Sequence, residues 1–262
     1  MTEIRKFPLI FLTMTNLFSD VFNLFFPRCC AVCGQRLTSV ESSLCTSCMA
    51  RLPLTHAHRM NPNPIEQLFW HQLPIVRATS FFFYDTEGSH QLIHLLKYHD
   101  RPQVGRDLAE YMATELRKDG FFDGIDLILP VPLHWRRRLR RGYNQSDYIA
   151  QGISCVTGIP IERHAVQRVV NNPTQTHKNI SERRSNVEQV FRLVKPERVA
   201  GCHVLLVDDV LTTGATAQAC GQELCSRGNV RVSVLTLAYA GSDFLTEPLP
   251  ETPVGGLISV GL

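Results

Sequence analysis

Short apolar runs alternate along this chain with longer stretches in which apolar residues recur at helical spacing. The runs predict buried strands, and the stretches predict helices that cover them. We expect strands at 77–84, 126–131, 165–170, 191–194, 204–207 and 230–238. We expect helices around 92–98, from Pro102 to about 116, at 143–156 and at 217–227. Apolar strands in a β-α-β-α order predict an α/β fold, a parallel sheet flanked by helices.

The first 26 residues and the last 22 stand apart from this pattern. An apolar side recurs through residues 9–25, which predicts an amphipathic helix. The apolar run is too short and too interrupted for a transmembrane helix, and we expect no targeting signal. Packing against the segment that follows is favoured over binding to a membrane surface. The expected divisions are an N-terminal helix at 1–26, a four-cysteine module at 27–55, a linker at 56–76, the main domain at 77–240 and a tail at 241–262.

The net charge of +3 over 262 residues implies no particular partner, but its distribution is uneven. Residues 134–198 hold thirteen Lys and Arg against five Asp and Glu. Within that region the long polar segment 171–185 is expected to be a lid or binding loop. The basic excess lies in the half of the chain where an anion site is expected.

Nine cysteines are present, and five of them fall between Cys29 and Cys48. Cys30, Cys33, Cys45 and Cys48 form two Cys-x-x-Cys pairs, a spacing that can close a tetrahedral structural Zn²⁺ site. Cys29 could replace Cys30, although the spacing favours Cys30. A redox pair is the alternative, but no thioredoxin-like βαβ unit surrounds the pairs. Zinc ribbons can also bind nucleic acid, and the sequence leaves that open. Thiol ligands of this kind indicate a reduced, cytoplasmic protein.

Two acids and a threonine-rich loop follow the most apolar strand of the chain. Asp208 and Asp209 come at the end of that strand, and Thr212, Thr213, Gly214, Ala215 and Thr216 lead into a helix. Small residues at a helix start offer backbone N–H groups to a phosphate, and the threonines add hydroxyls. Carboxylates suit a polyol or a metal instead. A sugar with a terminal phosphate satisfies both halves, and an ordinary capped turn would not explain two acids and three threonines.

Arginines crowd the segment that follows the 126–131 strand. Arg136, Arg137, Arg138, Arg140 and Arg141 fall within six positions, which we interpret as a basic loop. Such a loop could hold a pyrophosphate through guanidinium forks. It could equally follow the backbone of single-stranded nucleic acid, with Trp135 and Tyr143 for stacking. A solvated charged loop is the plain alternative.

The stretch from Val204 to Thr216 resembles the phosphoribosyl pyrophosphate (PRPP) motif of type I phosphoribosyltransferases. Several further motifs together resemble the ComF/GntX family, and they cover about residues 24–240. They are Phe26-Pro27, the four cysteines, His94-Leu-Leu-Lys97-Tyr98, Pro130-Val-Pro-Leu133, Arg141-Gly-Tyr-Asn-Gln145-Ser146, Thr174-Gln175, Arg183-Arg184-Ser-Asn186-Val187 and Phe191. Lys178 departs from the pattern, where an apolar residue is expected.

The resemblance implies a type I phosphoribosyltransferase fold and a PRPP site with Mg²⁺. In that site Thr212 to Thr216 would hold the 5-phosphate, and Asp208 and Asp209 the ribose hydroxyls. It also implies a cytoplasmic role in uptake or use of external DNA, beside a DNA-uptake helicase or translocation machinery.

Two functions remain open on the sequence. The first is a PRPP-binding accessory protein for DNA uptake that contacts single-stranded DNA. The second is an active phosphoribosyltransferase acting on an unidentified base or amine, with Arg136 to Arg141 on the Mg²⁺-bound pyrophosphate. No residue set indicates a base pocket or a general base. A zinc-ribbon transcription factor ranks low, because no recognition helix is apparent.

Overall fold

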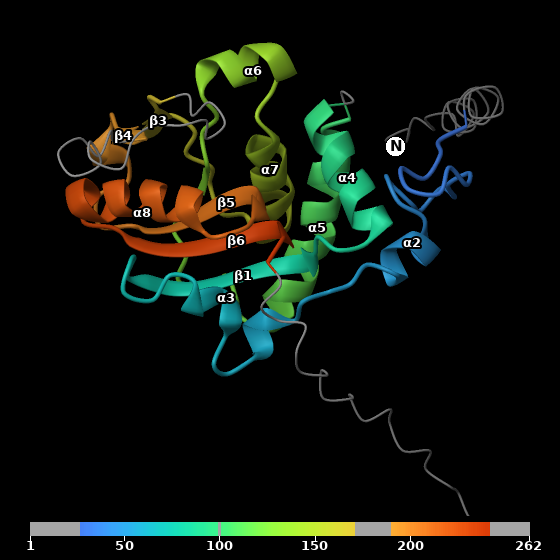
Figure 1. Ribbon diagram of the computed structural model, residues 1–262, viewed down its shortest axis with the longest axis horizontal. Helices are drawn as coiled ribbons and strands as arrows, with labels where there is room; N and C mark the ends of the chain where they lie inside the picture. The colour runs from blue at the N-terminus through green and yellow to red at the C-terminus, as the bar shows by residue number, and fades with distance from the viewer. Residues whose placement is uncertain (1–26, 99–100, 171–189, 242–262) are drawn as a thin grey trace, which may run out of the picture.

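Four parallel strands form the centre of the computed structural model, which describes residues 27–98, 101–170 and 190–241. Their order across the sheet is β1-β6-β5-β2, and every neighbouring pair is parallel (Figure 1). The bounds are Ile75–Phe83 for β1, Leu127–Pro130 for β2, His203–Leu211 for β5 and Arg231–Tyr239 for β6. The parallel sheet expected from the apolar runs is therefore confirmed.

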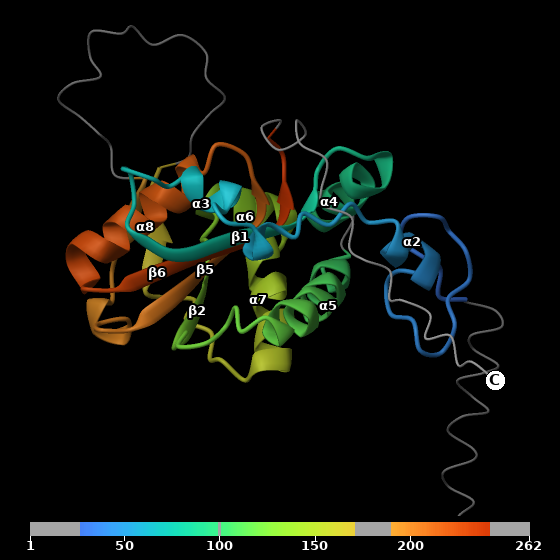
Figure 2. The same cartoon turned by 90° about the horizontal axis from the view of Figure 1, so that it is seen from below.

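Helices cover both faces of this sheet. They are α4 (Glu87–Tyr98), α5 (Gln103–Lys118), α7 (Gln145–Thr157) and α8 (Ala215–Gly228). Figure 2 shows α5 and α7 on one side of the sheet and α8 on the other. Alternate residues of β5 divide accordingly: Leu205 and Val207 belong to the core with α4, α5 and α7, and Val204 and Leu206 to the core with α8.

The segment expected to link the cysteine module to the domain lies against the edge of β1. The N–H of Thr55 donates to the Phe81 carbonyl (3.0 Å), and Asn63 Nδ2 donates to the Ala78 carbonyl (2.8 Å). The segment contains a short 3₁₀ turn, η1 (Ala57–Arg59), and the one-turn helix α3 (Pro64–Gln67). Ile65 and Phe69 are fully buried in the core beneath α8. This segment therefore covers sheet surface that would otherwise face water.

The cysteine module, with its short helix α2 (Thr46–Ala50), shares the core of α4 and α5. Leu37, Leu44 and Leu52 of the module are buried in that cluster. Gln91 of α4 donates to the Ala31 carbonyl (3.1 Å), and Ser43 donates to the Asp107 carboxylate of α5. The module is thus fixed to the main domain by packing and by hydrogen bonds.

Two expectations from the sequence were wrong. Residues 165–170 and 191–194 do not join the parallel sheet: β3 (Val166–Arg168) and β4 (Phe191–Leu193) pair antiparallel as a separate ribbon. The arginine-rich segment is a helix, α6 (Trp135–Arg141), and not a loop. His134 caps its N-terminus, and Gly142, at φ 79°, ends it in the left-handed conformation.

The expected N-terminal helix at 9–25, the lid at 171–185 and all of the tail except Gly241 lie outside the described residues. The proposed domain boundaries stay predictions. A short 3₁₀ turn, η3 (Pro196–Arg198), connects β4 to β5. Within the described ranges, no helix has the length and apolar character needed to cross a bilayer.

Gly152 is where α7 passes closest to α5. A Cβ on Gly152 would lie 2.3 Å from the Arg106 carbonyl oxygen and 2.8 Å from the Ala109 Cβ. We expect Gly152→Ala to push the helices apart and to lower the free energy of unfolding by about 1–3 kcal/mol, measured by urea denaturation. Gly88→Ala in α4 is the matched control. Its Cβ would make an ordinary 3.6 Å contact with Val32, so stability should hold or rise slightly. Equal effects of the two substitutions would contradict this packing.

Candidate functional site

A tight turn joins the end of β5 to the start of α8. Gly214 caps the helix with φ 79°, a conformation that a side chain would strain. A Cβ there would also lie 3.3 Å from Gln218 Nε2 and 3.5 Å from the Phe69 ring. Gln218 Nε2 in turn donates to the Leu68 carbonyl (2.8 Å). The segment around α3 therefore packs against the turn through Leu68 and Phe69, and the position of Gly214 leaves little room for a side chain.

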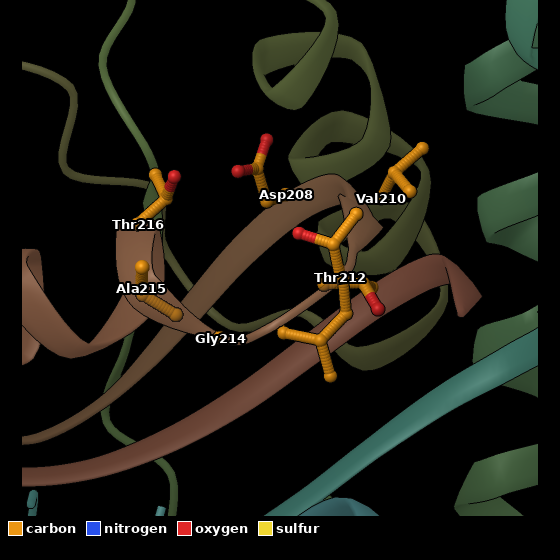
Figure 3. Close-up of a pocket in the computed structure, with 9 residues that line it drawn as sticks. Asp208, Val210, Thr212, Gly214, Ala215 and Thr216 are labelled. Carbon is orange, nitrogen blue, oxygen red and sulfur yellow. The ribbon is translucent and has the colours of Figure 1, made fainter. Parts of the chain in front are cut away.

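This turn borders a small hollow of about 40 Å³. The hollow is lined by Asp208, Val210, Leu211, Thr212, Gly214, Ala215, Thr216, Ala217 and Thr236. Figure 3 shows Asp208 on β5 and Thr216 in the first turn of α8 with their oxygens on the same side of the turn. Thr212 and Thr213 are exposed, and Thr216 is half-buried. Hydroxyl and backbone N–H groups at a helix start can bind a phosphate.

Thr236 is a part of this hollow that sequence reasoning missed. It lies on β6 beside Asp208 in the strand register, and its hydroxyl shares a 2.6 Å hydrogen bond with Ser80 of β1. The sequence signal was its polarity within an otherwise apolar strand. Thr236 is fully buried, so it forms part of the rigid floor of the hollow.

Asp208 is held in a surrounding that disfavours its charge. Burial, and then the neighbouring Asp209, raise the pKa of Asp208 to about 7. Hydrogen bonds oppose the rise: Ser146 of α7 donates to Asp208 Oδ1 (3.0 Å), and so does the N–H of Asp209 (2.9 Å). Asp208 can therefore gain or lose a proton near neutral pH, and a cation or hydroxyl donor brought beside it would favour the ionised form.

Asp209 faces the other side of the strand. Because β5 continues as a strand to Leu211, successive side chains alternate, and the two acids point apart. Lys97, in the last turn of α4, lies 3.4 Å from Asp209 Oδ2. The structure therefore gives each acid its own partner, Ser146 for Asp208 and Lys97 for Asp209.

One further cation, Arg168, interacts with Asp208. Arg168 on β3 is half-buried, with its guanidinium 5.4 Å from the Phe191 ring centre on β4. Burial, and then the nearby Arg137 of α6, lower the pKa of Arg168, while Asp208 raises it. Arg168 forms no ion pair with a described residue. Sequence reasoning missed Arg168, because it stood alone in a short strand.

The junction between α6 and α7 buries polar atoms that lack partners. Arg141 Nε, Asn144 Oδ1 and Gln145 Nε2 have no hydrogen-bond partner within the described part of the chain. Asn144 and Gln145 are 5% and 2% exposed. Buried polar groups are ordinarily satisfied, so this junction has capacity for a polar ligand beside Ser146 and Asp208. Asn144 and Gln145 belong to the family motif but were given no role from the sequence.

The remaining arginines of α6 lie on the outside of the molecule. Arg136, Arg138 and Arg140 are exposed, whereas Arg137 and Arg141 are half-buried. Figure 1 shows α6 at the top of the molecule, above α7. The structure therefore leaves three of the five predicted arginines exposed and partly buries the other two.

The four cysteines of the module converge on one point. The Sγ atoms of Cys30, Cys33, Cys45 and Cys48 all lie within 4.8 Å of one another. Four sulfurs bound tetrahedrally at about 2.3 Å from Zn²⁺ would be about 3.8 Å apart, so the cluster fits such an ion. Cys29 is exposed and outside the group; its Sγ lies 3.5 Å from the Pro27 carbonyl oxygen. The structure thus groups Cys30, and not Cys29, with the other three cysteines, and the ligand set stays a prediction.

The electrostatics around Cys30 favour a thiolate. Burial raises its pKa, but backbone N–H groups of Cys33, Cys45 and Val32 outweigh this and lower the pKa to about 6. Burial, and then hydrogen bonds within the cluster, raise the pKa of Cys48. A metal ion would hold all four as thiolates and remove this imbalance.

Comparison with known proteins places the chain in a family. It is 34% identical over 211 residues to DNA utilization protein YhgH of Escherichia coli K12. The alignment covers 79% of this chain and 88% of that protein. It is also 34% identical over 153 residues to competence protein F of Haemophilus influenzae (57% and 67%), and 31% identical over 112 residues to competence protein ComFC of Bacillus subtilis (42% and 43%). This chain belongs to the ComF/GntX family. No family model matches it.

Among solved structures, adenine phosphoribosyltransferase of Saccharomyces cerevisiae aligns with 73% of this chain and 90% of its own. The identity is 18% and the TM-score 0.37.

The raised pKa of Asp208 predicts a pH-dependent cost of folding. An unfolded aspartate ionises near pH 4, whereas folded Asp208 keeps its proton to about pH 7, so Asp208 lowers stability progressively as pH rises between these values. Asp208→Asn removes this cost. We expect its gain in unfolding free energy to be larger at pH 8 than at pH 5, by on the order of 1–3 kcal/mol.

Asp123→Asn, an exposed substitution near the opposite edge of the sheet, controls for the change in net charge. Urea denaturation at several pH values measures both variants. A gain for Asp208→Asn that stays constant from pH 5 to pH 8 would contradict the raised pKa.

The cysteine geometry predicts which thiols hold a metal. We expect Cys30→Ala to lose bound metal and to melt at a lower temperature, because one ligand and its share of the folding free energy are gone. Cys29→Ala should keep about one metal ion per chain, measured by plasma mass spectrometry. Equal loss of metal from the two variants would show that the ligand set is wrong.

Proposed function

We propose that this chain binds PRPP with Mg²⁺ at the carboxyl edge of its sheet. The observation that carries the proposal is the hollow bordered by Asp208 on one side and by the Thr212–Thr216 turn on the other. In this arrangement Thr212, Thr213, Gly214, Ala215 and Thr216 hold the 5-phosphate. Ligands of parallel sheets bind at this edge, where the strands end.

The acids then serve the ribose ring. Asp208 and Asp209 accept hydrogen bonds from the ribose hydroxyls, and Mg²⁺ accompanies the diphosphate. The surroundings of the acids support these roles, because Ser146 and Lys97 orient the two carboxylates. A ligand that carries hydroxyls and a divalent cation also relieves the cost of ionising Asp208.

A role in handling DNA follows from the relatives. The relatives named DNA utilization protein and competence protein F are each 34% identical to this chain, over 211 and 153 residues. We therefore assign this chain to uptake or utilisation of external DNA in the cytoplasm. Single-stranded DNA and a DNA-uptake helicase or translocation machinery would be its partners, and α6 supplies a basic surface for the former. The cysteine cluster would hold a structural Zn²⁺.

An active phosphoribosyltransferase is the second candidate. The observation in its favour is that Arg168 interacts with Asp208 and lies near Arg137, and these two cations could stabilise a departing pyrophosphate. The acceptor would be a base or an amine. Release of pyrophosphate from PRPP across a panel of bases and amines separates this enzyme from a binding protein.

The PRPP assignment predicts a ligand-dependent gain in stability. At a PRPP concentration about a hundredfold above Kd, with Mg²⁺, binding should stabilise the protein by about 2.7 kcal/mol and raise its melting temperature. Asp208→Asn/Asp209→Asn should abolish the rise, because the ribose hydroxyls lose both carboxylates. Differential scanning fluorimetry measures the shift.

Asp123→Asn again serves as the matched control and should respond as the unmodified protein does. Ribose 5-phosphate, which lacks the diphosphate, should give a smaller shift. A shift of unchanged size in the double variant would end the assignment of the acids.

A further inference from the structure

Helix α6 presents its residues on two opposite faces. Successive helical residues are about 100° apart, so residues four apart share a face. Arg137 and Arg141 form such a pair, and both are half-buried. Trp135 and Leu139 form another, at 61% and 79% exposed. The second pair is directed roughly 180° away from the first by this geometry.

The inner face lies beside Arg168 and Tyr98, one a neighbour of Asp208 and the other next in sequence to Lys97, the partner of Asp209. Arg137 lies close enough to Arg168 for the two charges to interact, and Arg168 also feels the charge of Asp208. Arg141 lies over the Tyr98 ring, 5.3 Å from its centre, next to Lys97 and its ion pair with Asp209. Like charges are held together here at a cost that an anion with several negative charges would offset.

The outer face combines exposed apolar surface with unpaired cations. Arg136 and Arg138 flank Trp135 and Leu139 on either side, and Arg140 lies between the two faces. None of these three arginines forms an ion pair within the described chain. The guanidinium of Arg136 lies 5.2 Å from the centre of the Trp135 ring system. The helix, Trp-Arg-Arg-Arg-Leu-Arg-Arg, carries no acid. Exposed aromatic rings for stacking beside cations for phosphates are the usual combination for single-stranded nucleic acid.

We infer that α6 is two binding elements in one helix: Arg137 and Arg141, with Arg168, hold the diphosphate of PRPP, and the opposite face holds single-stranded DNA. The first half rests on the proposed function, and the second half does not. Because the faces point apart, both ligands bind at the same time, and neither displaces the other. An acidic protein is the competing occupant of the outer face, but it would use the exposed indole less fully than a stacked base does.

Two matched double variants test this division. Arg137→Gln/Arg141→Gln and Arg136→Gln/Arg138→Gln each remove two charges from the same helix. PRPP with Mg²⁺ is titrated calorimetrically, and a labelled oligo-dT is followed by fluorescence anisotropy at several salt concentrations. Circular dichroism and the ligand-free melting temperature verify that each variant is folded.

The inner variant should weaken PRPP binding at least tenfold and oligo-dT binding less than threefold. The outer variant should show the reverse, with a salt slope for oligo-dT that is smaller by about 1.4, or about 0.7 for each phosphate that is no longer neutralised. Trp135→Ala should weaken oligo-dT binding at least fivefold and leave the salt slope unchanged, since stacking is not ionic. Saturating PRPP should not displace oligo-dT from the unmodified protein.

Several results would overturn the inference. Equal losses of both ligands in both variants would make α6 one undivided basic patch. Unmodified protein that binds PRPP but not oligo-dT would remove the outer assignment. Displacement of oligo-dT by an oligo-glutamate peptide as effectively as by unlabelled oligo-dT would show a surface selective for charge alone. Unmodified protein that binds oligo-dT but not PRPP would refute the proposed function and the inner assignment together, leaving the outer assignment standing.

Discussion

A carboxyl group fixed near the end of a buried parallel strand is costly to ionise. The elements packed around Asp208 and Asp209 supply the groups that offset this cost. The ladder between β5 and β6 continues past Asp208 to Leu211, so neither acid can turn away into water. Ser146 and Lys97 offset part of the cost from α7 and α4. In the proposed PRPP complex, the Mg²⁺ that accompanies the ligand would offset part of the remaining cost.

The support for this site comes from segments that are distant along the chain. Leu68 holds the side chain of Gln218 and so the first turn of α8, and Ser80 of β1 holds the hydroxyl of Thr236. Both supporting segments precede the site residues by more than a hundred positions. A parallel sheet produces this arrangement, because each strand returns to the same edge after its crossover. The Gly214 turn can then keep one shape while Thr212 and Thr213 remain exposed beside it.

Segments with strong hydrophobic periodicity could be predicted from the sequence, whereas short or unusual segments could not. The helices α5, α7 and α8 begin and end close to the expected residues because their apolar stripes are long, whereas α4 begins at Glu87, five residues before the expected start. In α6 the arginines mask any apolar stripe, so its helical geometry, and with it the two-sided placement of the charges, could not be predicted. Val166–Arg168 and Phe191–Leu193 were correctly predicted as strands, but three-residue strands carry no signal of their partner or direction. The threonine turn and the cysteine pairs were recognisable because their chemistry depends on spacing. Arg168 gave no local signal and Thr236 gave only its polarity within β6, because the roles of both residues depend on tertiary contacts.

The cysteine module and the candidate PRPP site meet through one helix. One face of α4 buries Leu92 and Leu96 in the core that includes Cys30 and Cys45, and the last turn of the same helix carries Lys97, beside Asp209. A segment as short as the module cannot bury enough surface to fold alone, so it depends on its contacts with α4 and α5 and, in the proposed zinc-bound state, on the metal. A metal ion bound by the four thiolates would then also stabilise the position of α4, the helix that orients one of the two acids.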